Sequence, residues 1–126
     1  EFPDIRLLPS IRTNEDPNLV KKETHRLLKE HGDLRGIYIT CGAVSTVGNI
    51  LKKLGRTDIK VICFEEYSEI IELMKDGIID ITIGSDLNYQ GQHSIDVLMD
   101  YLIYGKKTEK KHLYTEIKIL VKEHID

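Results

Sequence analysis

The stretch GIYITCGAVSTVGNILKKLG, residues 36–55, decides the fold class of this 126-residue chain. It opens with an apolar run typical of a buried strand and turns at Thr40, Cys41 and Gly42. Apolar residues at helical spacing follow at once, until Gly55 ends the pattern. A strand, a tight turn and a helix in direct succession form one β-α unit, and its turn is placed to contact a ligand.

The same alternation continues on both sides of this unit. A strand is predicted at residues 4–11 (DIRLLPSI), followed by a helix that Asp16 caps and Pro17 starts. IKVICF and IIDITI each precede a further helical pattern. The last segment, LYTEIKILV at residues 113–121, alternates as a strand does when one of its faces is wet. The pattern therefore predicts about five strands and four helices.

Strands as continuously apolar as GIYIT and IKVICF are typical of a sheet covered by helices on both faces. We therefore expect an α/β fold, a three-layer sandwich with a mainly parallel, doubly wound sheet. Right-handed crossovers place every strand-to-helix turn at one edge of such a sheet. The turns at residues 40–42, 65–66 and 84–86 should then lie side by side, forming half of a pocket.

Composition excludes several classes of protein. With 40% apolar residues the chain suits one domain, residues 1–126, and its net charge of −3 offers no broad basic surface for nucleic acid. No apolar segment approaches the roughly 20 residues that cross a bilayer. The N-terminus, EFPDIRLLPS, lacks the basic and apolar regions of a signal peptide. The chain begins with Glu, so we expect a piece of a longer protein. We expect no membrane partner, and two cysteines without a disulfide or metal pattern favour a reducing, cytoplasmic setting.

The two cysteines show no pattern of a metal or disulfide site. Cys41 and Cys63 lie 22 positions apart without a C-x-x-C pair. Cys41 stands at a helix start, where a thiol can become a nucleophile, but Val47 occupies the place of the arginine in a C-x5-R loop. No phosphate-binding glycine motif is present. Cys41 is therefore interpreted as a turn residue and Cys63 as a buried one.

Charged residues offer one further catalytic alternative. Glu65, Glu66 and Asp86 could form an acid pair, although a carboxylate in the first turn of a helix also suits the helix dipole. For Glu65, on the strand side of its turn, a ligand contact stays open. The histidines show no ligand spacing, so neither a metal nor a cofactor is expected. The basic run at residues 105–112 is interpreted as a solvated loop.

Three segments resemble the effector-binding domain of LacI-type (lactose-repressor family) bacterial regulators. They are the DGIID step at residues 76–80, the SDLNYQG segment at residues 85–91, similar to the family's Q-D-P-x-x-Q-G, and the ending YTEIKILVKEHID. The likeness covers most of the chain from about Leu34 onward. It implies the type I periplasmic-binding-protein-like fold, of which this chain would be one subdomain.

The resemblance also implies a site for a small effector, usually a sugar or a sugar derivative. The family's ligand-contacting positions fall on Cys41, Gly42, Glu65, Ser85 and Asp86. At Cys41 and Gly42 the family's polar side chains are missing, whereas Glu65 keeps the acidic charge on a longer arm. A hydroxyl left unpaired costs about 1–3 kcal/mol, so we expect an effector different from the typical family sugar, or contacts from the opposite wall.

Further partners follow from the resemblance alone. It implies a homodimer, to which Val47, Ile50, Leu51 and Tyr67 could contribute, although a core role is favoured for the same residues. It implies a truncated domain that lacks the DNA-binding headpiece and most of the N-terminal subdomain, so that DNA is reached only through absent sequence. Two alternatives stay open: a periplasmic sugar-binding protein of a transport system, and a small α/β enzyme using Glu65, Asp86 or Cys41. We expect no enzyme activity.

Overall fold

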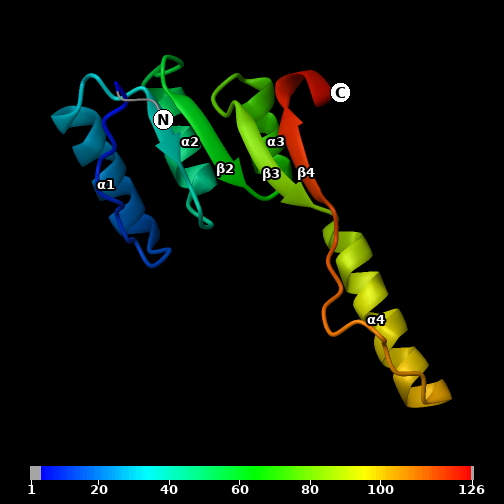
Figure 1. The fold of residues 1–126 in the computed structure, drawn as a ribbon. Coiled ribbons are helices and arrows are strands. Elements are labelled where there is room, and N and C mark those ends of the chain that lie inside the picture. The colour runs from blue at the N-terminus through cyan, green and yellow to red at the C-terminus, as the bar shows by residue number, and fades with distance from the viewer. Residues whose placement is uncertain (1–3, 126) are drawn as a thin grey trace.

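The computed structural model describes residues 4–125, which form one mixed sheet with helices (Figure 1). In chain order the elements are α1 (Pro17–Glu30), β1 (Gly36–Tyr38), α2 (Val44–Lys53), β2 (Lys60–Phe64), α3 (Ser68–Lys75), β3 (Ile81–Ser85), α4 (Leu87–Tyr104), β4 (Ile117–Val121) and a short 3₁₀ turn, Lys122–His124. No helix in this part of the chain has both the length and the apolar character needed to cross a bilayer.

The ends of the helices follow from local chemistry, as predicted. The Asp16 carboxylate accepts hydrogen bonds from the N–H groups of Asn18 (2.8 Å) and Leu19 (3.3 Å), and Pro17 opens α1. Gly55, Gly77 and Gly105 follow α2, α3 and α4 with φ of +65°, +73° and +63°. Glycine adopts this left-handed conformation without the penalty that a Cβ imposes. Each β-α unit is therefore closed where the sequence places a glycine.

The sheet has the order β1-β2-β3-β4. β1, β2 and β3 run parallel, with Tyr38 opposite Ile62 and Phe64 opposite Ile83. β4 runs antiparallel to β3 and pairs along all of it, from Ile81–Val121 to Ser85–Ile117. The predicted α/β class with a mainly parallel sheet is confirmed.

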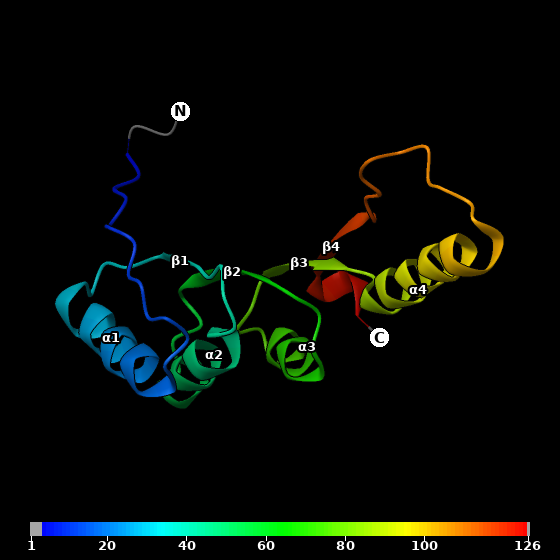
Figure 2. The ribbon, with the colours of Figure 1, turned by 90° about the horizontal axis from the view of Figure 1, so that it is seen from below.

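One helical layer covers one face of the sheet. Figure 2 shows α1, α2 and α3 side by side on the same side of the strands. The core lies between these helices and the strands, and its fully buried large side chains are Leu51, Ile59, Val61, Ile70, Met74 and Ile79. α2 and α3 approach closely, since a Cβ added at Gly48 would lie 2.5 Å from Cδ1 of Leu73. These contacts fix the positions of the turns that follow β1 and β2.

The opposite face of the sheet is also apolar but carries no helix in residues 4–125 (Figure 2). Tyr38, Ile117 and Ile119 are exposed there, and the Tyr38 and Phe64 rings lie 5.9 Å apart. We call this surface the open face; its other members are the half-buried Ile62, Phe64, Ile81 and Ile83. The strands are thus apolar on both sides, as predicted, while the described residues supply only one of the two helical layers.

α4 is likewise left uncovered by the other residues that the structure describes. It extends beyond the end of β3, away from the other helices (Figure 1), and none of its residues is buried. Its exposed apolar residues include Leu87, Ile95, Leu98 and Leu102, which with Gly91 and Ser94 form one stripe along the helix. We call these residues the α4 stripe.

Two predicted strands differ from the structure. The strand predicted at residues 4–11 is wrong, because this segment forms no ladder and leaves Ile5 and Leu7 exposed. Pro9 lacks the N–H that a ladder needs, and the nearest edge, β1, offers only three residues. The last strand begins at Ile117 instead of residue 113. Because the strand predicted at residues 4–11 does not form, the described residues contain four strands instead of about five.

Candidate functional site

Three turns converge at the carboxyl edge of the parallel strands. Because β1, β2 and β3 are parallel and in register, their carboxyl ends meet at one edge (Figure 1). The residues at and after these ends, 40–42, 65–66 and 84–86, therefore lie along that edge, as the sequence predicts. Open parallel sheets bind their ligands outside this edge. Its polar groups determine what the edge could hold.

The turn after β1 is partly occupied by a residue from the same chain. Gly42 is exposed, and its N–H donates a long hydrogen bond of 3.4 Å to Oε1 of Glu15. Cys41 is half-buried and packs against the core cluster. This turn thus offers few free polar groups, and Glu15 brings an additional carboxylate to the edge. Sequence reasoning missed Glu15, because it lies 27 positions before the residue that it contacts.

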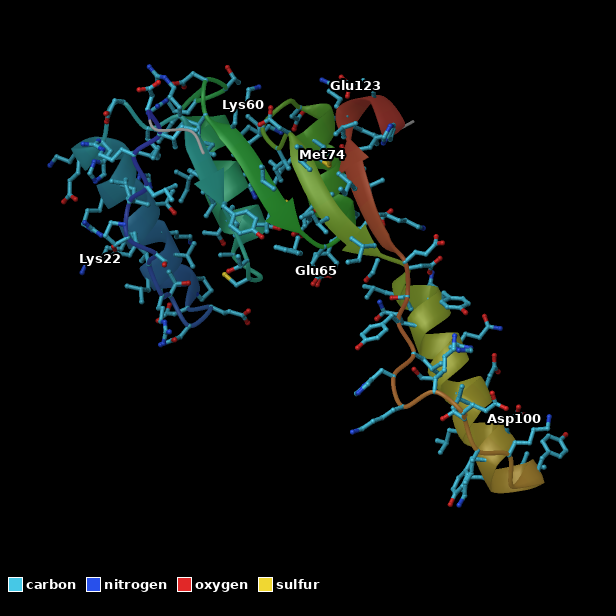
Figure 3. The ribbon with its side chains drawn as sticks, in the orientation of Figure 1. Lys22, Lys60, Glu65, Met74, Asp100 and Glu123 are labelled. Carbon is cyan, nitrogen blue, oxygen red and sulfur yellow. The ribbon has the colours of Figure 1, made fainter. Side chains whose placement is uncertain are left out.

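The turn after β2 holds the most constrained candidate residue. Glu65 has a φ of +79°, a left-handed conformation that costs a residue with a Cβ about 1–3 kcal/mol. Its N–H donates to the carbonyl of Ile83 (3.0 Å), and its own carbonyl accepts from the hydroxyl of Thr82. The next residue, Glu66, folds over Gly84, where a Cβ would lie 3.0 Å from the Glu66 carboxylate. Figure 3 shows Glu65 at the end of β2.

The turn after β3 is tied to the chain before β4. The Gln90 amide donates to Oγ of Ser85 (2.8 Å) and to Oγ1 of Thr115 (2.9 Å). Asp86 caps α4 by accepting from the N–H of Tyr89 (2.9 Å), and Nζ of Lys118 lies 3.8 Å from its other oxygen. Since Ser85 accepts from Gln90, its hydroxyl proton can still be donated to a ligand. Asp86 is already engaged as a cap.

A hollow adjoins this turn. It has a volume of about 380 Å³ and is lined by Asp86, Tyr89, Tyr114, Thr115, Glu116 and Lys118. The sequence did not predict that the segment before β4 would contribute, because a parallel β4 would have placed this segment elsewhere. The antiparallel register, with Ile117 opposite Ser85, brings Thr115 and Lys118 to the edge. The ammonium group of Lys118 and the hydroxyl of Thr115 thus lie beside Asp86, which the sequence predicted to be at this edge.

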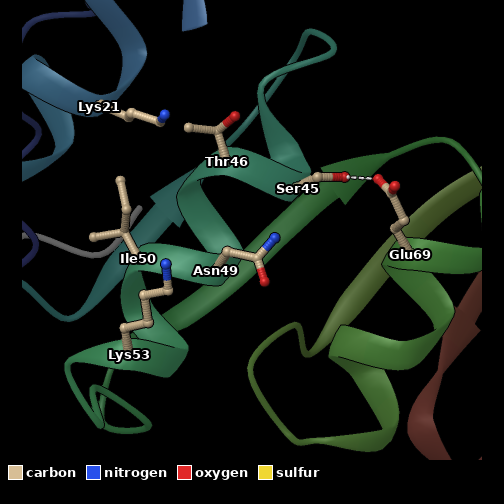
Figure 4. Close-up of a pocket in the computed structure, with 7 residues that line it drawn as sticks. All are labelled: Lys21, Ser45, Thr46, Asn49, Ile50, Lys53 and Glu69. Carbon is tan, nitrogen blue, oxygen red and sulfur yellow. Dashed lines mark hydrogen bonds between the residues drawn. The ribbon is translucent and has the colours of Figure 1, made fainter. Parts of the chain in front are cut away.

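A second hollow of about 380 Å³ lies on the helical layer, away from the sheet (Figure 4). It is lined by Lys21, Ser45, Thr46, Asn49, Ile50, Lys53 and Glu69. One hydrogen bond crosses its rim, from the Ser45 hydroxyl to Glu69 (2.6 Å). None of the residues predicted to bind a ligand lies in this hollow, so the carboxyl edge is the stronger candidate.

The catalytic alternatives find no assembled group in residues 4–125. Cys63 is fully buried, and this burial raises the pKa of its thiol, although a hydrogen bond with Thr82 acts in the opposite direction. Among the described residues no hydrogen bond or ion pair joins Cys41, Glu65 and Asp86 to one another. No three His, Cys, Asp or Glu side chains in this range gather closely enough to hold a metal ion.

The sequence of residues 1–107 matches the family of the periplasmic binding protein domain. The chain belongs to this family. The match covers the three β-α units and the turns after β1, β2 and β3, and it ends before Thr115 and Lys118. Among curated proteins, no sequence matches the chain.

Solved structures of this fold superpose well on the periplasmic binding protein domain described above. A carbohydrate transporter solute binding protein from Agrobacterium radiobacter, in complex with D-arabinose, has a TM-score of 0.86 at 17% identity, over 98% of this chain and 42% of its own. An ABC transporter solute binding protein from Agrobacterium vitis, bound to α-D-tagatopyranose, has a TM-score of 0.85 at 18% identity, over 98% and 41%. A candidate LacI transcriptional regulator from Bacteroides fragilis has a TM-score of 0.77 at 24% identity, over 90% and 38%.

At these identities the likeness is one of fold. The chain spans about 40% of the length of these structures. The domain therefore matches less than half of each of these neighbours, and what its carboxyl edge binds is a matter for proposal.

Proposed function

We propose that the chain is the effector-binding part of a LacI-type bacterial transcription regulator. It would bind a small molecule, a sugar or a sugar derivative, at the carboxyl edge, and it would act in the cytoplasm without catalysing a reaction. The observation that carries a binding function is the convergence of three turns, two of them with polar side chains, at one edge of a periplasmic binding protein domain. The ending YTEIKILVKEHID, which resembles regulators, favours regulation over transport.

Two side chains would make the main contacts with the effector. Glu65 supplies a carboxylate that accepts hydrogen bonds from hydroxyl groups, and no salt bridge in residues 4–125 occupies it. Ser85 supplies a hydroxyl whose proton is free to be donated. A sugar presents neighbouring hydroxyls that both donate and accept, so these groups suit it. Cys41 and Gly42 would contribute shape, and Asp86 would hold α4 in place.

A second lobe would complete the site. The neighbours are more than twice as long as the chain, and here both the open face and the α4 stripe present uncovered apolar surface. Burial of apolar surface is worth about 25 cal/mol per Å², so such surfaces favour a covering partner. We propose that further sequence of the same protein covers them and forms the opposite wall of the cleft. Occupancy would be transmitted through that lobe to a DNA-binding domain outside this chain.

The second candidate function is that of a solute binding protein of a sugar transporter. It is favoured by neighbours of this class, which have D-arabinose and α-D-tagatopyranose bound in the same fold. The carboxyl edge would serve either function in the same way. Only the first candidate requires a DNA-binding domain and a cytoplasmic location, so cell fractionation of the intact protein separates them.

Calorimetric titration of the intact protein with a panel of monosaccharides and their phosphates tests the binding function. We expect one sugar to bind and to be recovered unchanged, and we expect Glu65→Gln to weaken it about tenfold through loss of a charged hydrogen bond. Glu69→Gln, a neighbouring carboxylate outside the edge, is the matched control and should leave affinity unchanged. If no sugar binds, or if both variants bind equally well, the proposed site is wrong.

The regulatory function needs a second measurement. The intact protein should retard a DNA fragment from its own upstream region, and the bound sugar should change that affinity. A protein that binds the sugar but no DNA, and that is released with the periplasmic fraction, would instead be the transport protein.

We also propose that the intact protein is a homodimer. In the structure Val47, Ile50 and Leu51 are buried within the chain itself, which favours their core role, whereas Tyr67 is half-exposed. Tyr67 is therefore the interfacial candidate of this set. Sedimentation over a concentration series should show a dimer that Tyr67→Asp weakens, and a monomer at all concentrations would contradict it.

A further inference from the structure

We propose that Thr82 is a positioning residue, whose buried hydroxyl holds Glu65 in the conformation that directs its carboxylate toward the ligand. This inference rests on the proposed function for the role of Glu65, and it adds a residue that does not itself reach the carboxyl edge.

Glu65 has a backbone conformation that is unusual for its residue type. Its φ of +79° suits glycine, and a side chain at such a position has to be held by its surroundings. Glycine would fit here without strain, yet the position carries a long acidic side chain. That side chain is partly exposed at the end of β2, and no ion pair within residues 4–125 engages it. The strained backbone thus presents a carboxylate that is free to bind.

Two residues of β3 hold the backbone of Glu65 in this conformation. Ile83 accepts the hydrogen bond from the Glu65 N–H (3.0 Å), and Thr82 donates its hydroxyl to the Glu65 carbonyl. Both peptide groups of Glu65 are therefore fixed by two successive residues of the neighbouring strand. Thr82 is fully buried and pairs with Cys63 in the β2-β3 register. A rigid strand interior thus fixes the position of an edge residue.

The Thr82 hydroxyl is a polar group in the buried interior of β3. A buried hydroxyl is unfavourable unless it forms a hydrogen bond, and valine would fill the same volume in a strand without needing one. Among the described residues the Thr82 hydroxyl donates its hydrogen bond to the backbone carbonyl of Glu65. The hydroxyl is therefore used at the point where β2 ends and the chain turns toward α3.

Thr82→Val and Thr82→Ser in the intact protein test the proposal. Val keeps the shape and removes the hydroxyl, whereas Ser keeps the hydroxyl. Crystal structures of both variants without ligand should show Glu65 at negative φ in Thr82→Val and at positive φ in Thr82→Ser. If Glu65 keeps its positive φ in Thr82→Val, the proposal is overturned, whether or not a sugar is known.

Affinity for the monosaccharide selected by calorimetry supplies the second readout. We expect Thr82→Val to bind it about tenfold more weakly and Thr82→Ser to bind within about twofold of the natural protein. In a Glu65→Gln background Thr82→Val should have little further effect, because Thr82 acts through the Glu65 carboxylate. Equal losses in both backgrounds would show a general structural role and overturn the proposal. If no sugar binds, the proposed function fails, while the φ of Glu65 still tests Thr82.

Discussion

At the scale of single residues, buried backbone groups of this domain depend on a few carboxylates from distant positions. Val61 is fully buried in β2, and its N–H donates to the Asp80 carboxylate (2.8 Å), while its carbonyl accepts from the Asp80 N–H (3.0 Å). Lys60 adds an ion pair to the same carboxylate (2.6 Å). Asp80 thus closes the amino edge of the sheet, as Thr82 and Glu65 shape its carboxyl edge.

Asp80→Ala should lower the free energy of unfolding by about 1–3 kcal/mol, because it leaves the buried N–H of Val61 without an acceptor. Asp80→Asn keeps an acceptor oxygen and should cost less. Lys60→Ala, which removes only the exposed partner, should cost at most about 1 kcal/mol. Urea unfolding of the three variants measures the order, and equal losses for Asp80→Ala and Lys60→Ala would contradict the role of Val61.

Asp58 gives the domain a pH-dependent contribution. Hydrogen bonds from Arg56 (2.7 and 3.0 Å), with the charge of Arg35 nearby, lower the pKa of the Asp58 carboxyl. A lowered folded pKa means that the contribution is present above the unfolded value of roughly 4 and is lost as the pH falls through the folded value. The difference in urea midpoint between the natural protein and Asp58→Asn should therefore be full at neutral pH and shrink in acid. A pH-independent difference would exclude this linkage.

At the scale of elements, the packing of α2 against α3 depends on a small residue where the two helices approach each other. Gly48 is buried in α2, and Leu73 of α3 occupies the space that a side chain would need. Because both helices pack on the same face, their separation also sets the distance between the turns after β1 and β2.

Gly48→Val should destabilise the domain by about 1–3 kcal/mol, since the added methyl groups force Leu73 out of its place in the core. Asn49→Val is the matched control at an exposed position of α2, and it carries only the small helix-propensity cost of a β-branched residue. Thermal unfolding of both variants should separate them clearly. A control as unstable as Gly48→Val would mean that the backbone of α2, and not the contact with Leu73, is responsible.

The sequence predicts elements well where the signal is local. The Asp16-Pro17 pair and the glycines at 55, 77 and 105 mark helix ends that the structure reproduces, because capping and left-handed turns involve only near neighbours. The segment at residues 4–11 has the composition of a strand but finds no partner, and pairing cannot be read from composition. Whether β4 runs parallel or antiparallel to β3 could not be predicted either, since both directions fit the alternation of apolar and polar residues in this strand.

The candidate site was predictable in outline only. That residues 40–42, 65–66 and 84–86 share an edge follows from the parallel order of the strands. That Glu15 reaches Gly42, and that Gln90 joins Ser85 to Thr115, depends on contacts between residues 25 or more positions apart. The left-handed backbone of Glu65 carries no signal in the sequence, because the residue type there is one that normally avoids it.

At the scale of the whole molecule, the domain has one packed half and two uncovered apolar surfaces. α1, α2 and α3 bury the core against the sheet, whereas the open face and the α4 stripe remain exposed. Amide protons in elements with few buried contacts exchange readily, because local opening costs little there. The elements packed around the core and α4 should therefore differ in the rate of amide proton exchange.

Hydrogen exchange of the 126-residue chain in dilute solution should be fast in α4 and slow in α2 and β2. In a form of the protein that includes the proposed second lobe, α4 should become protected as its stripe is covered. As a control, the exchange measurement is repeated at lower protein concentration. Protection of α4 that persists comes from covering within one molecule, whereas protection that is lost comes from self-association. Protection of α4 equal to that of α2 in the dilute 126-residue chain would contradict the proposed docking role of the stripe.

The antiparallel pairing of β4 has a mechanical consequence. α4 leaves the sheet after Ser85 and the chain returns at Ile117, and these two residues lie opposite each other in the ladder. Any part of the protein that packs on α4 is thus connected to the sheet through two chain segments. These are spaced by about 5 Å, the distance between neighbouring strands. Two connections permit α4 to bend about the line that joins them. They oppose the rotation about a single bond that one connection alone would allow. With this attachment, the outer end of α4 moves relative to the sheet in one preferred direction.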